Sequence, residues 1–136
     1  MNYPITDPKG SLLKRALLAN AAFSAVSGFL IVLLDGRLSA LLGIVELQLW
    51  PIGVMLLGFA AYLVWFATRP TVNSGGAMSI ILSDLAWVAG TVILLLGWND
   101  LFSTAGVWLL GGIGVVVFLL AELQWLGLRR LRLAQT

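Results

Sequence analysis

The sequence predicts an all-α protein, a polytopic transmembrane four-helix bundle, and two observations carry this prediction. Of its 136 residues, 60% are hydrophobic and 10% are charged, and the mean hydropathy is +1.02. Soluble domains contain roughly 45–50% apolar residues and about 25% charged ones. The apolar residues also fall in four runs of about 20 residues, the length that crosses the hydrocarbon core of a bilayer as a helix. We therefore expect residues 1–136 to form a single transmembrane domain.

Turn or helix-breaking residues mark the boundaries of the predicted spans. Gly36 lies in the Asp-Gly-Arg turn signal after the first span, and Pro51 stands in the first turn of the second. Pro70 follows the second span, and the polar stretch TVNSGGA is predicted to be a loop before the third. Asn99 closes the third span. The predicted spans are residues 12–34, 50–68, 77–98 and 104–126.

The residue types that are absent exclude several kinds of chemistry. The chain has no Cys and no His. Disulfides, thiol redox chemistry, metal sites with Cys or His ligands, haem ligated by two histidines and a histidine general base are therefore excluded. We expect no cofactor, no metal and no enzymatic activity. The net charge of +2 does not indicate nucleic-acid binding, because the basic residues are few and flank the apolar runs.

The positions of Lys and Arg orient the predicted bundle. Seven of the eight lie on one side: before the first span, between the second and third, or after the fourth. Cytoplasmic loops carry the excess of Lys and Arg in membrane proteins, so both termini are predicted to be cytoplasmic. The bases beside the first and fourth spans form a cluster that we interpret as a topology signal or a binding surface for anionic lipids. This basic cluster comprises Lys14, Arg15, Arg129, Arg130 and Arg132.

The first apolar segment has an alternative interpretation as a secretory signal peptide. Basic residues precede it, and it contains the small-residue stretch ANAAFSA. Its apolar run of ~20 residues is longer than the 7–15 residues of a typical signal sequence. Cleavage would also remove bases from the side where the others gather. A retained transmembrane span is the interpretation that the charge pattern favours.

The two halves of the chain resemble each other. A shift of 64 residues places Asn20 on Asp84 and Phe23 on Trp87, and a shift of 61 places one IGV triplet, at Ile52, on another. Leucine-rich helices align easily, so the polar matches carry the comparison. The pattern predicts a tandem duplication of a helical hairpin, with the halves related by a pseudo-twofold axis along the membrane normal.

An ionisable residue inside the third span is the main candidate for a functional site. Asp84 lies ~10 Å from the cytoplasmic end of its span, and Asn20 lies ~12 Å from that of the first. Glu122 lies ~6 Å from the inner end of the fourth span. A charged group costs free energy in lipid, so Asp84 should face the bundle interior. Trp87 and Thr91 lie on the same helical face as Asp84 and complete the predicted polar site.

The partners of these side chains are predicted only as alternatives. Asp84 could accept a hydrogen bond from Asn20, or pair with Arg15 or Arg69 reaching inward. Such an acid serves to hold helices together, to bind a proton or cation, or to contact a partner protein. Glu122 is expected to bond with Arg129 or Gln124.

Pairs of small residues predict which helices approach closely. Ser24 and Gly28 in the first span, and Ala86 and Gly90 in the third, are spaced four residues apart. Small residues at this spacing let helix backbones come together in membranes. We therefore expect the first and third spans to meet at the centre of the bundle.

The segments LLKRALLANAAFSAVSG, SDLAWVAGTVILLL, LFSTAG and ELQWLGLRRLR resemble a group of small, uncharacterised bacterial four-helix integral membrane proteins. The resemblance covers nearly the whole chain, through motifs of low specificity. It implies a location in the bacterial inner (plasma) membrane. It implies no catalytic activity and no site residues beyond Asn20, Asp84 and Trp87 as distinctive positions.

Two functions follow as hypotheses. The first is an accessory or scaffold protein that packs with itself or with a larger complex in the lipid bilayer through its small-residue faces. The second is a small proton- or cation-coupled transporter or channel with Asp84 at its site. The outer half of the predicted bundle offers too few polar residues for an evident aqueous path. Whether a lipid, quinone or pigment fills grooves between the spans is left open.

Overall fold

The computed structural model describes residues 2–5, 8–45 and 47–136, and within these ranges it consists of helices, two three-residue strands and short connections. Four helices are long and apolar enough to cross a membrane, as predicted. A fifth helix, α2 (Asp35–Leu42), is short and follows directly on the first. The membrane-length helices are α1 (Ser11–Leu33), α3 (Trp50–Ala67), α4 (Ser74–Gly97) and α5 (Thr104–Leu133).

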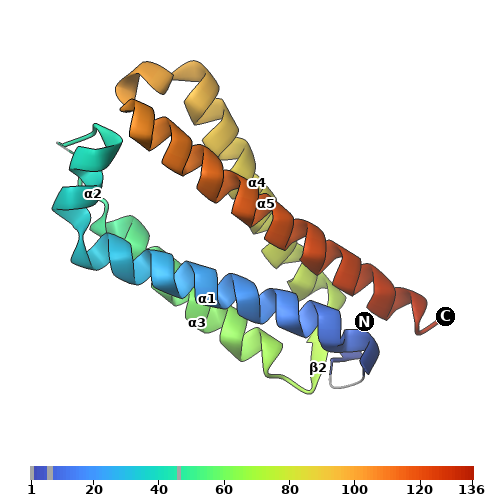
Figure 1. Cartoon of the computed structure of the whole chain (residues 1–136). Helices are drawn as coiled ribbons and strands as arrows, with labels where there is room; N and C mark the ends of the chain where they lie inside the picture. The colour runs from blue at the N-terminus through green and yellow to red at the C-terminus, as the bar shows by residue number, and fades with distance from the viewer. Residues whose placement is uncertain (1, 6–7, 46) are drawn as a thin grey trace.

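The helices form two hairpins, one of α1 with α3 and one of α4 with α5 (Figure 1). Helix α1 packs against both α3 and α5, so it links the hairpins. The hairpins lie together near the two chain termini and separate toward the opposite end (Figure 1). We call the region of the two termini the termini end. We call the region of α2 and the 3-10 helix η2 (Asn99–Leu101) the far end.

A small sheet closes the termini end. Strand β1 (Asn2–Pro4) pairs antiparallel with β2 (Thr71–Asn73), with Tyr3 opposite Val72. One residue further, the Ile5 N–H donates to the Pro70 carbonyl at 3.1 Å. Tyr3, Ile5 and Val72 are buried under the helices. The N-terminal segment is thereby attached to the connection between α3 and α4, which the sequence pattern did not indicate.

The apolar core lies in the half of the molecule nearest the termini. Gly127 of α5 crosses Leu13 of α1 so closely that a Cβ at position 127 would stand 2.7 Å from the Leu13 backbone. Only glycine allows the hairpins this approach. The buried core cluster consists of Tyr3, Ile5, Leu13, Leu17, Ala21, Leu63, Phe66, Ala67, Val72, Ala77, Ile80, Ile81, Leu128 and Leu131.

Backbone groups link the hairpins at the far end. The Ser103 N–H donates to the Leu42 carbonyl at 2.9 Å, and the Ser103 hydroxyl donates to the Leu41 carbonyl. Asp35 begins α2 and accepts a hydrogen bond from the Leu49 N–H at 2.6 Å, just before α3. The far end is therefore connected through the backbone of the last turn of α2 and through Gly106 of α5, where a Cβ would stand 2.9 Å from the Leu42 carbonyl. The termini end is connected mainly through packed side chains.

Three segments differ from their predicted structure. TVNSGGA is not a loop, because Thr71–Asn73 is strand and the Asn73 side chain accepts from the Gly75 N–H at 2.7 Å, which caps α4. Helix α5 continues to Leu133 rather than ending near 126, because Leu128 and Leu131 are buried in the core. The predicted turn at 35–37 is instead the first turn of α2.

The first and third spans meet, as predicted, where Asn20 bonds to Asp84, but the predicted contact through their small residues is wrong. A Cβ at Gly28 would stand 2.8 Å from the Gly53 carbonyl, so this face of α1 packs on α3. Ala86 and Gly90 are exposed, and a Cβ at Gly90 would meet no atom within 4 Å. Helices α3 and α4 compete for the small-residue face of α1. Helix α3 occupies it because a shorter stretch of chain connects α3 to α1.

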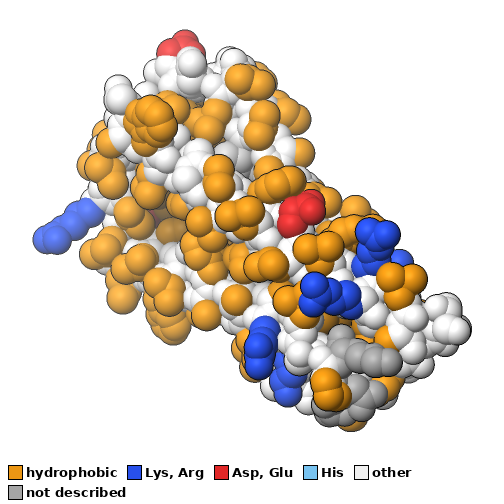
Figure 2. Space-filling model, turned by 45° about the vertical axis from the view of Figure 1, so that its right-hand side comes forward, with side chains coloured by type: hydrophobic (Ala, Val, Ile, Leu, Met, Phe, Trp, Pro, Cys, Tyr) orange, Lys and Arg blue, Asp and Glu red, His pale blue; other side chains and the backbone are white. Residues whose placement is uncertain are grey.

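The surface separates apolar from basic side chains. Hydrophobic side chains cover most of the face in Figure 2, and most of the Lys and Arg side chains gather toward its lower end. The termini lie at this end of the molecule in Figure 1. An apolar middle with bases at one end is the distribution expected of a chain that crosses a membrane.

Candidate functional site

Three helices bring polar side chains together around Asp84 of α4. The Asn20 Nδ2 of α1 donates a hydrogen bond to Asp84 Oδ2 at 2.6 Å. The Gln124 Nε2 of α5 donates to the same oxygen at 3.0 Å. The Ser24 hydroxyl donates to Asn20 Oδ1 at 3.3 Å. We call Asn20, Ser24, Asp84 and Gln124 the polar node.

The polar node is buried in the bundle. Asn20 is 1% exposed, Ser24 4%, Asp84 5% and Gln124 0%. Buried polar groups cost free energy unless they are hydrogen-bonded, and in a membrane no water replaces a lost partner. The node therefore joins the hairpins, because separating α1 from α4 and α5 would break the bond of Asn20 to the buried Asp84 carboxylate, while the Gln124 bond stays within the α4–α5 hairpin.

Matching depths along the helices make the node possible. At about 1.5 Å rise per residue, Asn20 lies ~14 Å from the start of α1, and Asp84 lies ~15 Å from the start of α4. Gln124 lies ~14 Å before the end of α5. All three helix ends lie at the termini end, so the three side chains share one level of the bundle (Figure 1).

Amide groups, rather than a cation, face the Asp84 carboxylate in the described part of the chain. The predicted hydrogen bond with Asn20 is confirmed. The alternatives with arginine are not, because Arg15 is exposed and the Arg69 guanidinium lies 3.8 Å from the centre of the Trp65 ring. Two amide N–H groups from different helices direct the positive ends of their dipoles at the carboxylate. They take the place that the full positive charge of an arginine would have taken.

One polar atom of the node is left over. Gln124 Oε1 is buried and has no hydrogen-bond partner among the described residues. It is a carbonyl acceptor beside a carboxylate, so the node can take one more donor, such as a water molecule or a proton carried by Asp84. This atom is the only sign, within the described ranges, of chemistry beyond helix association.

The structure brings Gln124 rather than Glu122 to the node, contrary to the prediction. Residues two positions apart in a helix point about 200° apart around its axis. Glu122 therefore points away from the node when Gln124 points into it. Glu122 is exposed, and it forms neither of the predicted bonds to Arg129 or Gln124. The sequence signal that could have identified Gln124 is its spacing with the buried Val117, Ala121 and Leu128, at intervals of four and three residues.

Trp87 and Thr91 do not join the node either. The Trp87 side chain is 37% exposed. The Thr91 hydroxyl donates to the Trp87 carbonyl at 2.9 Å, within α4. The Thr91 methyl group faces Gly114 of α5, where a Cβ would be 3.6 Å away. These two residues belong to the packing of the α4–α5 hairpin and its surface, not to a polar site.

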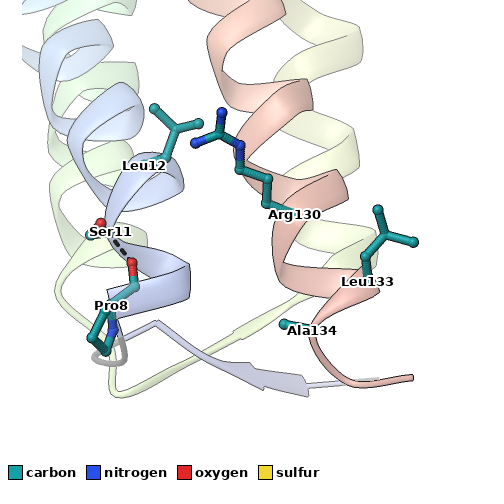
Figure 3. A pocket seen from close by; sticks show the side chains of 6 residues that line it. All are labelled: Pro8, Ser11, Leu12, Arg130, Leu133 and Ala134. Carbon is teal, nitrogen blue, oxygen red and sulfur yellow. Dashed lines mark hydrogen bonds between the residues drawn. The ribbon is translucent and has the colours of Figure 1, made fainter.

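The basic cluster lies around the termini end. Arg15, Arg129 and Arg130 are exposed, while Lys14 and Arg132 are half-buried. A hollow of about 480 Å³ separates the start of α1 from the end of α5. The Arg130 guanidinium extends into it toward Leu12 (Figure 3).

A second hollow, of about 450 Å³, is an apolar groove along α1 and α3. Leu18, Ala22 and Ala25 of α1 and Leu57 and Ala61 of α3 are among the residues that line it. Its lining offers contacts to a hydrocarbon chain and no polar side chain. Within the described ranges, no group of three or more acidic side chains could hold a metal ion.

Comparisons with protein-family models, with curated proteins and with solved structures found no match for this chain. A functional assignment therefore depends on the geometry of the polar node and on the surfaces around it.

Proposed function

We propose that this chain is a small integral membrane protein with an accessory or scaffold function, packing with itself or with a larger membrane complex. The observation that carries the proposal is the use of Asp84. Its Oδ2 accepts hydrogen bonds from Asn20 and Gln124, so the one buried acid described here joins two hairpins. A carboxylate that accepts hydrogen bonds from two neighbouring helices favours a role in helix association over a role in transport or catalysis.

Apolar packing on both sides of the node also favours a structural role. Toward the termini end, the buried side chains of Leu17, Ile80 and Leu128 lie beyond the node. Toward the far end, the Thr91 hydroxyl is bonded within its own helix. A transported ion needs a succession of polar groups or water along its path. The described side chains supply one polar level and not a succession.

The proposed location is the bacterial inner (plasma) membrane, with both termini cytoplasmic. The gathering of Lys and Arg near the termini supports this orientation through the positive-inside rule. The proposed duplication of a hairpin is supported by the contact of Asn20 with Asp84, which are equivalent positions under the 64-residue shift. The basic cluster serves as the topology signal or binds anionic lipids.

The test compares the wild type with Asp84→Asn in sealed vesicles. The accessory function predicts no flux driven by a pH gradient for either protein, and a complex of defined stoichiometry in mild detergent. Flux in the wild type that disappears in Asp84→Asn would overturn the accessory function. Asp100→Asn is the matched control, because Asp100 is exposed at the far end.

A second candidate function is a proton- or cation-coupled transporter or channel, which the free Gln124 Oε1 favours. A proton on Asp84 could be donated to this carbonyl, so the node could accept one positive charge without changing its fold. The vesicle assay decides between the two functions. Gln124→Leu gives a second variant, which removes the free acceptor and should abolish flux if the node carries it.

A further inference from the structure

An acidic side chain stands on an otherwise apolar outer face of α5. Glu122 is exposed, and it lies on the side of the helix opposite the buried Gln124. Around it, Phe118 is 43% exposed and Leu119 is 55% exposed. Figure 2 shows an acidic side chain surrounded by hydrophobic ones on the visible face.

Glu122 has no hydrogen-bond or ion-pair partner in the ranges that the structure describes. It lies about 27 Å along the helix from Thr104 and ~16 Å from Leu133, within the part of α5 that is long enough to cross a bilayer. Arg129 is two turns away, about 10.5 Å along the axis. An ionisable group facing lipid is costly, and such groups in membrane helices nearly always have a partner.

We propose that this outward face of α5 binds a transmembrane helix of another protein that carries Lys or Arg at the level of Glu122. The inference rests on the proposed accessory function and names the chemistry of the partner. We define the acidic face as the residues of α5 that share the direction of Glu122. These are Trp108, Gly111, Val115, Phe118, Glu122, Trp125 and, two turns beyond Glu122, the exposed Arg129.

The shape of the acidic face suits a helix. A Cβ at Gly111 would meet no atom within 4 Å, so nothing in this chain occupies the space beside it. Val115 is 59% exposed and Trp108 is 78% exposed, on the turns that surround Gly111. A small residue flanked by large apolar ones allows a neighbouring helix to approach closely and bury area on both sides.

The charge of the face selects the occupant. In a symmetric dimer each copy uses the same surface, so a twofold contact through this face would place the two Glu122 carboxylates near each other. Like charges in a medium of low dielectric repel strongly. A Lys or Arg from another protein gives the opposite result, because it pairs with the carboxylate and removes the cost of leaving it in lipid.

The test uses synthetic single-span helices as probes. Three Leu/Ala peptides with the same flanking residues carry Arg, Leu or Glu at one position, about four residues from one end. The chain lacks Cys, so Gln135→Cys places a single fluorophore at the exposed C-terminal end. Binding is measured by energy transfer in phosphatidylcholine vesicles. We expect the Arg peptide to bind about tenfold more tightly than the Leu peptide.

Variants at Glu122 separate the charge from the shape of the face. Glu122→Gln should lose most of the preference for Arg, while Asp100→Asn keeps it. Glu122→Arg should reverse the preference and favour the Glu peptide. Each variant is checked for helix content and thermal unfolding, and an exposed position should leave both unchanged.

Three results would overturn the inference. The first is equal binding of the three peptides, and the second is an Arg preference that survives in Glu122→Gln. The third is a self-association that is tighter than peptide binding and depends on Glu122, which would identify a second copy as the occupant. Equal binding without flux overturns this inference and leaves the accessory function standing. Selective Arg binding together with Asp84-dependent flux overturns the accessory function and leaves the binding of a basic helix by the acidic face standing.

Discussion

The two ends of this molecule hold the same pair of hairpins by different means. At the termini end, α1 and α5 cross at Gly127, the polar node bonds three helices, and a two-stranded sheet covers the helix ends. At the far end, the described links between the hairpins include the Ser103 bonds to the last turn of α2. The difference teaches that more of the buried contacts between the hairpins lie at the termini end than at the far end.

The physical reason for this difference is how much free energy is lost when the contacts at each end are separated. Packed side chains and buried hydrogen bonds lose much when they are separated, because nothing in lipid replaces them. A backbone bond at a loop can be exchanged for a bond to water. We therefore expect substitutions at the termini end to destabilise the protein more than substitutions at the far end.

The largest effect is expected at the crossing of α1 and α5. In Gly127→Val, the added Cβ would stand 2.7 Å from the Leu13 backbone and would push the hairpins apart. We expect a loss of about 3 kcal/mol or more in the free energy of unfolding, since overpacking against backbone cannot relax. Unfolding in mixed micelles measures it. Gly112→Val is the control, because a Cβ there meets no atom within 4 Å; a comparable loss in the control would contradict the comparison.

The next effect is expected where the N-terminal segment enters the core. Ile5 is 1% exposed, and Ile5→Ala removes most of a buried side chain. We expect a loss of about 2 kcal/mol, together with faster hydrogen exchange at Val72 in the paired strand. Asn2→Ala, at an exposed position of β1, should change neither quantity. Unchanged exchange at Val72 in Ile5→Ala would show that the sheet does not depend on this packing.

A smaller effect is expected at the polar node. Asp84→Leu leaves the Asn20 and Gln124 amides without their acceptor and should cost about 1–2 kcal/mol, given the modest value of hydrogen bonds between membrane helices. Asp84→Asn retains an acceptor and should cost less than half of that. The coupling between Asp84→Leu and Asn20→Leu in a double-mutant cycle measures the bond directly. Strict additivity of the two substitutions would show that the node does not hold the hairpins together.

The smallest effect is expected at the far end. Ser103 caps α5 by accepting from the Gly106 N–H at 3.0 Å, and its hydroxyl also donates to the Leu41 carbonyl. Ser103→Ala should cost about 1 kcal/mol or less, as the loss of a helix cap does. Thr104→Ala, one residue further and exposed, is the control. A loss larger than that of Asp84→Leu would reverse the proposed order of the two ends.

The positions of the helices follow from the sequence, whereas their contacts follow from it only in part. The first two spans, predicted at 12–34 and 50–68, are Ser11–Leu33 and Trp50–Ala67 in the structure. The hydrogen bond between Asn20 and Asp84 was among the predicted alternatives, because both residues lie at the same depth of their helices. Depth follows from counting residues along a helix, which needs no knowledge of the neighbours.

The third member of the node could not be chosen in the same way. Glu122 and Gln124 differ by only about 3 Å in depth, so depth does not distinguish them. The ionisable Glu122 was predicted because a charge in a membrane helix needs a partner more than an amide does. The directions of Glu122 and Gln124 differ by about 200°, and the direction of a helical face depends on which neighbours the helix packs against. The exposed Glu122 and the buried Gln124 exchange their expected places for this reason.

The sequence by itself predicted a lipid environment, the number of membrane-length helices and the depth of each polar group along its helix. These properties depend on local composition and on a constant rise per residue, so they can be read along the chain. The tertiary structure alone decided that Gly28 faces α3, that residues 2–4 pair with 71–73 and that Gln124 completes the polar node. Each of these depends on the rotation and crossing of whole helices, which only the simultaneous packing of all of them determines.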